Sequence, residues 1–219
     1  MFCRQIELLG EKNQKRLASL QALVVGAGGL GYSIAEGLSC IGLAKVVVVD
    51  FDRISTSNLH RQFGYTLSDV GKFKVEALAN RLNRCSTPVI GVVGKVEKIE
   101  WEKYGLNRGK WIIFDGTDRL ESRHQIILLS ARYSQPWVYS GVEEWRGAVA
   151  YFSPGEGREF LPSGDWKPVS GQFPPLVGMV AHLAVGVGIR NWLGLEKPTL
   201  YYLNYSPANS LSIISISKN

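Results

Sequence analysis

The chain has 219 residues, of which 45% are hydrophobic and 20% are charged, a balance that supplies a buried core and excludes a disordered chain. Lys and Arg outnumber Asp and Glu by 25 to 19, which gives a formal net charge of +6. The basic residues form no runs, so we expect an anionic ligand or partner rather than nucleic acid.

The three cysteines, Cys3, Cys40 and Cys85, lie far apart in the sequence. Their spacing predicts neither a disulfide framework nor a zinc site made of cysteine pairs. Such usage is typical of a reducing cytoplasm. The longest apolar stretch, residues 176–189, is about fourteen residues long, short of the roughly 20 that a membrane helix needs, and no apolar leader follows Met1. We expect a soluble, cytoplasmic protein with no membrane partner.

The N-terminal third predicts a helical arm followed by a βαβ unit. Apolar residues recur at helical spacing over residues 1–20. Two runs of mostly valine then predict buried parallel strands over 22–25 and 45–49, with a helix-length segment over 30–41 between them. Strand, glycine turn, helix and strand within about thirty residues form one βαβ unit. A further helix is predicted over 72–84.

The rest of the chain predicts more strands, one loop and one long helix. Strands are expected over 89–96, 111–114, 137–140 and 148–152. The last two either continue the parallel sheet or form a hairpin. Five prolines and four glycines predict a loop over 153–175, before a helix over 176–193 and two strands over 200–203 and 211–216.

We therefore predict one α/β domain over residues 1–219. Its sheet is open and Rossmann-like, mostly parallel, with antiparallel strands added toward the C-terminus and helices on both faces.

A glycine-rich turn follows the first strand. Gly26, Gly28 and Gly31 satisfy the G-x-G-x-x-G pattern, with Gly29 beside them, where the backbone can approach a phosphate closely. Asp50 ends the second strand, where a carboxylate can accept hydrogen bonds from ribose hydroxyls. The pattern in this context predicts nucleotide binding. Taken alone, it favours a dinucleotide such as NAD.

The polar segment after Asp50 favours a triphosphate instead. It carries Ser57, Asn58 and Arg61, and Lys74 follows in the first turn of the next predicted helix. A cation at a helix start opposes the helix dipole unless an anion is bound nearby. A triphosphate calls for Arg, Lys and a metal ion more than a dinucleotide does. Asp118, just past the strand over 111–114, is the candidate ligand for Mg²⁺.

These motifs together resemble the ThiF/MoeB/HesA family, the bacterial relatives of ubiquitin-activating E1 enzymes. The resemblance covers about residues 3–152 and resumes at 174–193. Its matching motifs are Arg4-Gln5, Gly26 to Gly31, Val49-Asp50-Phe51-Asp52, Ser57-Asn58-Leu59-His60-Arg61-Gln62, Asp69 to Lys72, Lys74-Val75-Glu76 and Asp115-Gly116-Thr117-Asp118.

The resemblance implies ATP-dependent adenylation of the C-terminal glycine of a ubiquitin-like sulfur carrier, usually in thiamine or molybdopterin synthesis, by a homodimer. By position it implies that Gly29 touches the nucleotide and that Asp50 holds the ribose. It assigns phosphate contacts to Ser57, Asn58, Arg61 and Lys74, and Mg²⁺ binding to Asp118. Arg4 would reach into the partner subunit's site.

The chain departs from the family in its cysteines. Many members carry two Cys-x-x-Cys pairs that bind zinc, and some carry a cysteine before the last large helix. This chain has no such pair and no cysteine after Cys85. We expect no zinc and no covalent thioester at that position, so adenylation alone is the conservative interpretation.

Two alternatives to the adenylyltransferase stay open. A nucleotide-binding scaffold would dock a ubiquitin-like or peptide partner without turnover, and the missing cysteines favour it slightly. An NAD-dependent oxidoreductase rests on the glycine turn and Asp50 only. Binding of ATP with Mg²⁺ in preference to NAD separates the oxidoreductase from the other two.

Overall fold

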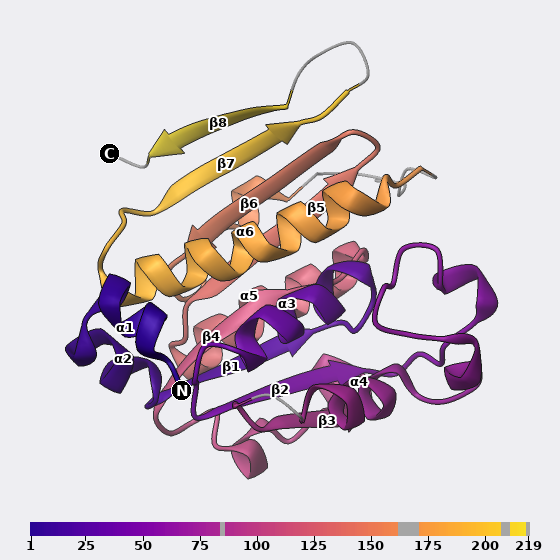
Figure 1. Cartoon of the computed structure of the whole chain (residues 1–219), viewed down its shortest axis with the longest axis horizontal. Coiled ribbons are helices and arrows are strands. Elements are labelled where there is room, and N and C mark those ends of the chain that lie inside the picture. Colours follow the sequence, from indigo (N-terminus) through magenta and orange to yellow (C-terminus); the bar gives the residue numbers. More distant parts are fainter. Residues whose placement is uncertain (84–85, 162–170, 207–210, 218–219) are drawn as a thin grey trace.

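The computed structural model describes residues 1–83, 86–161, 171–206 and 211–217. Among these residues, eight strands form one sheet in the order β3-β2-β1-β4-β5-β6-β7-β8 (Figure 1). The strands are β1 (Leu20–Val25), β2 (Lys45–Asp50), β3 (Val89–Val93), β4 (Lys110–Asp115), β5 (Trp137–Glu143), β6 (Arg146–Phe152), β7 (Thr199–Asn204) and β8 (Ser212–Ser217). The α-helices are α1 (Cys3–Leu9), α2 (Glu11–Leu17), α3 (Gly29–Ser39), α4 (Lys74–Leu82), α5 (Leu120–Tyr133) and α6 (Pro174–Leu193).

The sheet is parallel from β3 to β5 and antiparallel from β5 to β8. On β1, Val24 pairs with Val48 of β2 on one side and with Phe114 of β4 on the other. The predicted fold class is therefore confirmed. The choice left open for β5 and β6 is also settled, because they form an antiparallel hairpin whose turn places Glu144 at φ 51°.

Helices cover both faces of the parallel strands. Val24, Val48 and Phe114 point into a core shared with α3, α4 and α6, and Figure 1 shows α3 and α6 side by side over that face. Leu23 and Ile113 point the other way, into a second core with α5. Because both faces are buried, these strands appear in the sequence as unbroken apolar runs rather than as an alternating pattern.

Several predicted boundaries shift in the structure. The arm over residues 1–20 is two short helices that meet at Gly10, at φ 78°, and β1 begins within that range at Leu20. Helix α4 begins at Lys74 rather than at residue 72, and residue 84 lies outside the described residues. The predicted loop over 153–175 contains a 3₁₀ turn, Arg158–Phe160, and the first residues of α6; residues 162–170 lie outside the described residues.

Helix α6 is longer than the sequence analysis predicts. Its 20 residues and its hydropathy satisfy the length and composition of a membrane span, but 56% of that apolar stretch is buried inside the protein. Leu176, Val180 and Ala184 are fully buried in the core beneath it. The helix therefore has the packing of a core helix.

Candidate functional site

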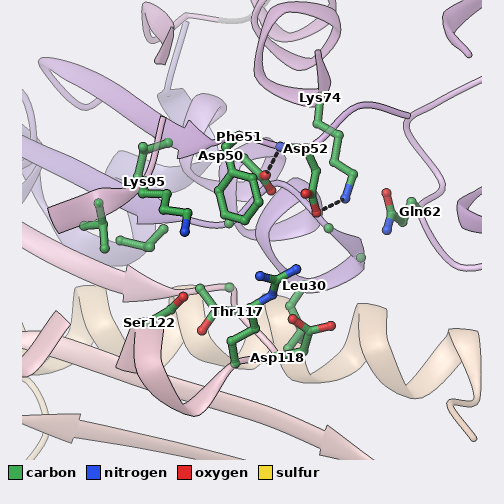
Figure 2. A pocket seen from close by; sticks show the side chains of 18 of the residues that line it. Leu30, Asp50, Phe51, Asp52, Gln62, Lys74, Lys95, Thr117, Asp118 and Ser122 are labelled. Carbon is green, nitrogen blue, oxygen red and sulfur yellow. Dashed lines mark hydrogen bonds and ion pairs between the residues drawn. The ribbon is translucent and has the colours of Figure 1, made fainter. Parts of the chain in front are cut away.

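A cavity lies at the carboxyl ends of β1, β2 and β4. It has a volume of about 410 Å³, within the range of small-molecule sites. Strand β1 lies between β2 and β4, so the crossover connections leave it in opposite directions at this edge. Open α/β sheets bind ligands at such a switch point. Figure 2 shows the side chains that surround this cavity.

The glycine turn between β1 and α3 forms the cavity floor, and close backbone contacts require a glycine at Gly26, Gly29 and Gly31. A Cβ on Gly31 would lie 1.9 Å from the carbonyl oxygen of Gly26, and one on Gly29 would lie 2.8 Å from that of Arg61. Gly26, Gly28 and Gly29, the glycines that the sequence analysis assigns to nucleotide binding, all line the cavity. Within the described part of the chain no side chain caps α3, so the N–H groups of its first turn are available to a ligand.

Asp50 is held at the end of β2 by two backbone groups. Its Oδ2 accepts a hydrogen bond of 2.7 Å from the Ala27 N–H, and its Oδ1 accepts one of 2.7 Å from the Asp52 N–H. Burial raises the pKa of Asp50 above its usual value, while these two N–H donors and Lys74 oppose that rise. The carboxylate lines the cavity in a fixed orientation, where it can accept a ligand hydroxyl.

Lys74 lies on the same wall as the first residue of α4. Its side chain is buried, and its Nζ lies 3.2 Å from Asp52 Oδ2 (Figure 2). The hydroxyl of Tyr65 donates to the carbonyl of Ala27 at 2.8 Å and also lies 3.3 Å from the carbonyl of Lys74. Tyr65 therefore ties the start of α4 to the glycine turn, which fixes the cation relative to the cavity floor.

The polar segment after β2 contributes two of its three predicted phosphate ligands to the cavity. Asn58 and Arg61 line it, but Ser57 does not and instead lies exposed with its Oγ 2.9 Å from that of Ser55. Asn58 has a structural role as well, because its Oδ1 accepts from the Ser55 N–H at 3.2 Å. Among the described residues, Arg61 has no carboxylate partner, so its charge is available to an anion.

The two acids after β4 have different roles. Asp115 is fully buried and accepts from Arg123 Nε at 3.0 Å and from the Thr117 hydroxyl at 2.7 Å. It anchors the turn and does not face a ligand. Asp118 lines the cavity, and among the described residues its carboxylate has no hydrogen-bond donor and no ion-pair partner.

The donor set at Asp118 fits Mg²⁺ bound together with a polyphosphate. No cluster of three or more His, Cys, Asp or Glu side chains occurs among the described residues. A cation in this cavity would therefore take most of its ligands from phosphate oxygens and water. Mg²⁺ is commonly held in this way, by one or two carboxylates plus substrate phosphates.

Arg4 does not line the cavity of its own chain. It lies exposed on α1, where Gln5 Nε2 donates to the carbonyl of Ile41 at 3.0 Å, just beyond the C-terminal end of α3. The glycine turn lies at the opposite end of that helix. An 11-residue helix is about 16 Å long.

Two features of the site were not predicted from the sequence. Gln62 is buried in the cavity wall, and its Oε1 has no hydrogen-bond partner among the described residues. Phe51 lies 5.6 Å from Lys95 Nζ and 5.2 Å from the Arg119 guanidinium, so a cation–π cluster stands beside the cavity. Gln62 and Phe51 lie within recognised motifs, but nothing in the sequence reports their burial or partners.

The chain has a strand, a glycine turn and a helix, followed by a carboxylate on the next strand and basic side chains at the carboxyl edge. These features define a Rossmann-like α/β protein with a cavity suited to an anionic ligand. The comparison with known families is more specific. The chain belongs to the ThiF family, whose model matches residues 2–217. This confirms the family resemblance.

Curated relatives of similar sequence are named as adenylyltransferases. A sulfur carrier protein adenylyltransferase of Thermus thermophilus is 32% identical over 145 residues, covering 66% of this chain and 53% of the relative. The adenylyltransferase and sulfurtransferase MOCS3 of Caenorhabditis briggsae is 31% identical over 147 residues, covering 67% of this chain and 37% of the relative. The chain thus spans about a third to a half of these relatives.

Solved structures share the fold across the whole chain. MccB of E. coli, solved with ATP, superposes with a TM-score of 0.78 at 18% identity, covering 99% of this chain and 70% of that one. PaaA superposes with a TM-score of 0.76 at 19% identity, covering 99% and 72%. At this level of identity the likeness shows the fold alone.

Proposed function

We propose that this protein uses ATP to adenylate the C-terminal glycine carboxylate of a ubiquitin-like sulfur carrier. The observation that carries the proposal is the convergence of Arg61, Lys74 and Asp118 on one cavity above the glycine turn. The names of the curated relatives support the same activity. Asp50 would hold the ribose and so orient the nucleotide along the floor.

The chemistry needs positioning and charge neutralisation rather than a protein nucleophile. A carboxylate oxygen of the carrier attacks the α-phosphorus of ATP, the bond from that phosphorus to the bridging oxygen breaks, and pyrophosphate leaves with the bonding electrons. Arg61 and Lys74 would neutralise the charge that builds on the phosphates. Mg²⁺, when bound with ATP at Asp118, would supply further neutralisation.

Carrier-dependent exchange between ATP and pyrophosphate tests the proposal. Arg61→Ala and Asp118→Ala should each slow the exchange by roughly 10²–10³-fold, because each removes a group that neutralises transition-state charge. Arg108→Ala, an exposed arginine outside the cavity, is the matched control and should change the rate less than about twofold.

A loss of less than about threefold in both cavity variants would remove the site assignment. Absence of exchange with every Gly-Gly carrier of the host, despite ATP binding, would favour the scaffold instead. Preference for NAD over ATP in calorimetry would favour the oxidoreductase. A small copurifying protein that ends in Gly-Gly would identify the carrier and place the enzyme in thiamine, molybdopterin or another synthesis.

We also propose that the reaction stops at the acyl-adenylate, without zinc. No cysteine follows Cys85, and the chain has no paired cysteines to supply tetrahedral sulfur ligands. The protein should therefore contain less than stoichiometric zinc in elemental analysis and should form no adduct with its carrier that a reductant releases. Stoichiometric zinc, or a carrier adduct that a reductant releases, would contradict this part of the proposal.

Arg4 would complete the site of the partner subunit in a homodimer. Its place at the far end of α3 argues against a role in its own cavity.

Complementation between two variants tests this role. Arg4→Ala and Asp118→Ala homodimers should both have low activity. If the two are co-expressed equally and pair at random, half of the dimers are mixed, and one of the two sites in each is intact. Activity should then recover to about one quarter of wild type, as expected of an isologous interface. No recovery, or a monomer in light scattering, contradicts the trans role.

A further inference from the structure

Asp52 connects the carboxyl end of β2 to the start of α4. Its carbonyl accepts a hydrogen bond of 3.1 Å from the Lys74 N–H, and its Oδ2 lies 3.2 Å from Lys74 Nζ. Its own N–H donates to Asp50 Oδ1 at 2.7 Å, and the residue lines the same cavity. Asp52 is thus held between the carboxylate expected to bind the ribose and a cation expected to bind phosphate. Adenylation as proposed gives it no role of its own.

The ion pair between Asp52 and Lys74 is unequally buried, and its buried member is the cation. The side chain of Lys74 is 8% exposed, whereas that of Asp52 is 42% exposed. Among the described residues, no other carboxylate forms an ion pair with Lys74 Nζ. Burial favours the neutral form of a lysine, and a nearby carboxylate favours the charged form. Asp52 is therefore the group that keeps a positive charge at Lys74.

The other charged and titratable groups around Lys74 do not replace this carboxylate. Asp50, on β2, attracts Lys74 through its charge, but both of its oxygens already accept backbone N–H groups. Arg61, which lines the same cavity, adds positive charge and so favours the neutral amine. The Tyr65 hydroxyl contacts the Lys74 carbonyl rather than the ammonium group. Without the charge of Asp52, the buried ammonium group would have no paired anion before a ligand binds.

The ammonium group of Lys74 has more donors than Asp52 uses. A lysine ammonium has three N–H donors, of which the contact with Asp52 Oδ2 takes one. Figure 2 shows Lys74 and Asp52 together on one side of the cavity, with Asp118 on the other side. A phosphate can therefore bind the remaining donors while the ion pair stays intact. The contact also restricts a flexible four-carbon side chain to one direction.

We propose that Asp52 is a positioning residue, which keeps Lys74 charged and directs its free N–H donors toward the phosphates of ATP. This role rests on the proposed adenylation and adds to it a residue that acts through Lys74. The carboxylate itself does not contact the phosphates, because like charges repel. Two other roles make different predictions. A second Mg²⁺ ligand beside Asp118 would act on the metal ion, and a purely structural contact would act on stability alone.

A double-mutant cycle tests whether Asp52 acts through Lys74. The variants are Asp52→Asn, which keeps the side-chain size and removes the charge, Lys74→Met, and the two combined. At about pH 8, Asp52→Asn should lower kcat/KM for ATP in carrier-dependent pyrophosphate exchange by roughly tenfold when Lys74 is present. It should lower kcat/KM less than about twofold in the Lys74→Met background, because the group that it positions is gone. Thermal unfolding checks that each variant is folded at the assay temperature.

The pH profile supplies a readout that a structural contact would not change. Without its counterion, the buried amine in Asp52→Asn should lose its proton as the pH rises from about 7 toward 9.5, so kcat/KM for ATP should fall. Wild type and Asp52→Glu, which keep the carboxylate, should vary less than about twofold over that range. Adding Lys74→Arg to Asp52→Asn should remove the fall, because a guanidinium stays protonated. Glu97→Gln is the matched control, since it removes an exposed carboxylate that lines the cavity without pairing with Lys74, and it should keep the wild-type profile.

Failure of this role differs from failure of the proposed function. A level profile in Asp52→Asn, an equal loss in both Lys74 backgrounds, or a loss that higher Mg²⁺ restores would each overturn the role of Asp52 and leave adenylation standing. Wild-type protein that binds ATP without carrier-dependent exchange would overturn adenylation instead. The calorimetric Kd for ATP over the same pH range then tests Asp52 alone, because affinity should fall in Asp52→Asn and not in wild type. An equal pH dependence of the two would overturn the role.

Discussion

The parallel and antiparallel parts of the sheet differ in burial and in the functional groups that they carry. Strands β1, β2 and β4 are buried on both faces, and Val46, Val47 and Val48 are fully buried. In the antiparallel part every residue of the edge strand β8 is exposed, including Ile213, Ile214 and Ile216. All but three of the residues that line the cavity lie between residues 25 and 125.

The difference shows why the candidate site lies in the parallel part. Parallel strands joined by crossover helices all end at the same edge, so the loops after β1, β2 and β4 meet there. In the antiparallel part successive strands end at opposite edges, and their loops are separated. The parallel part thus gathers functional groups, whereas the antiparallel part extends the sheet.

The largest expected effect comes from a methyl group at the glycine turn. Gly31→Ala should abolish ATP binding or the fold itself, because its Cβ would meet the Gly26 carbonyl at 1.9 Å. Gly186→Ala makes the same change on α6, where no atom lies within 4 Å, and should leave the protein unchanged or stabilised by up to about 1 kcal/mol. Thermal unfolding and calorimetric ATP titration measure both. Equal effects would contradict the close packing of the turn.

The next effect concerns the buried ion pair behind the cavity. Arg123→Leu should lower the free energy of unfolding by about 3–5 kcal/mol, since it leaves Asp115 buried without its cation. Arg132→Leu is the control on the same helix, and it should have little effect because its bond to Glu102 lies at the surface. Urea unfolding distinguishes them. A small effect at Arg123 would mean that Asp115 is satisfied by other groups.

Truncation of isoleucine compares the parallel and antiparallel parts of the sheet directly. Ile112→Ala in β4 should cost about 2–5 kcal/mol, because the side chain is fully buried between β1 and the helices. Ile214→Ala in β8 should cost less than about 0.5 kcal/mol, because that side chain is 59% exposed. Urea unfolding measures both. A large loss at Ile214 would indicate that β8 is covered in solution.

The sequence predicted the features that arise from local patterns. Valine runs predicted the parallel strands, and the glycine spacing placed the turn between β1 and α3. Lys74 was correctly expected in the first turn of α4. These predictions succeeded because a strand buried on both faces and a turn with no room for a Cβ each restrict the residue types allowed.

Features that depend on long-range packing were not predictable in the same way. Strands β5 and β6 are antiparallel because a short turn folds the chain back on itself. Their residue patterns are compatible with either direction, so the sequence left this choice open. Ser57 and Asn58 are adjacent in the sequence, yet only Asn58 faces the cavity, since the 3₁₀ turn Thr56–Asn58 sets their directions. The single domain, the homodimer, the cytoplasmic location and Mg²⁺ stay predictions.

The smallest expected effect is a pH dependence of ligand affinity at Asp50. A ligand hydroxyl that donates to this carboxylate requires its ionised form, so a proton competes with the ligand. Because burial raises the pKa of Asp50 above 3.8, affinity for adenosine should be full above that raised pKa and should fall by at most about tenfold per pH unit below it. Adenosine is the probe because it has no phosphate to titrate. Asp50→Asn should bind weakly with no such dependence.

The accompanying change in stability separates this loss of affinity from acid unfolding. A carboxyl group with a raised folded-state pKa disfavours the folded state when ionised, so the contribution of Asp50 to stability rises as the pH falls through that pKa. Burial alone would raise the pKa of Asp69, but hydrogen bonds from Thr66 and Lys72 lower this pKa to about 2. The contribution of Asp69 to stability is therefore lost only as the pH falls from about 4 toward 2. As the pH is lowered, adenosine affinity should therefore begin to fall at a higher pH than the unfolding midpoint does. If the two decline together, in wild type and Asp50→Asn alike, the loss is unfolding, and Asp50 is not the acceptor of the hydroxyl.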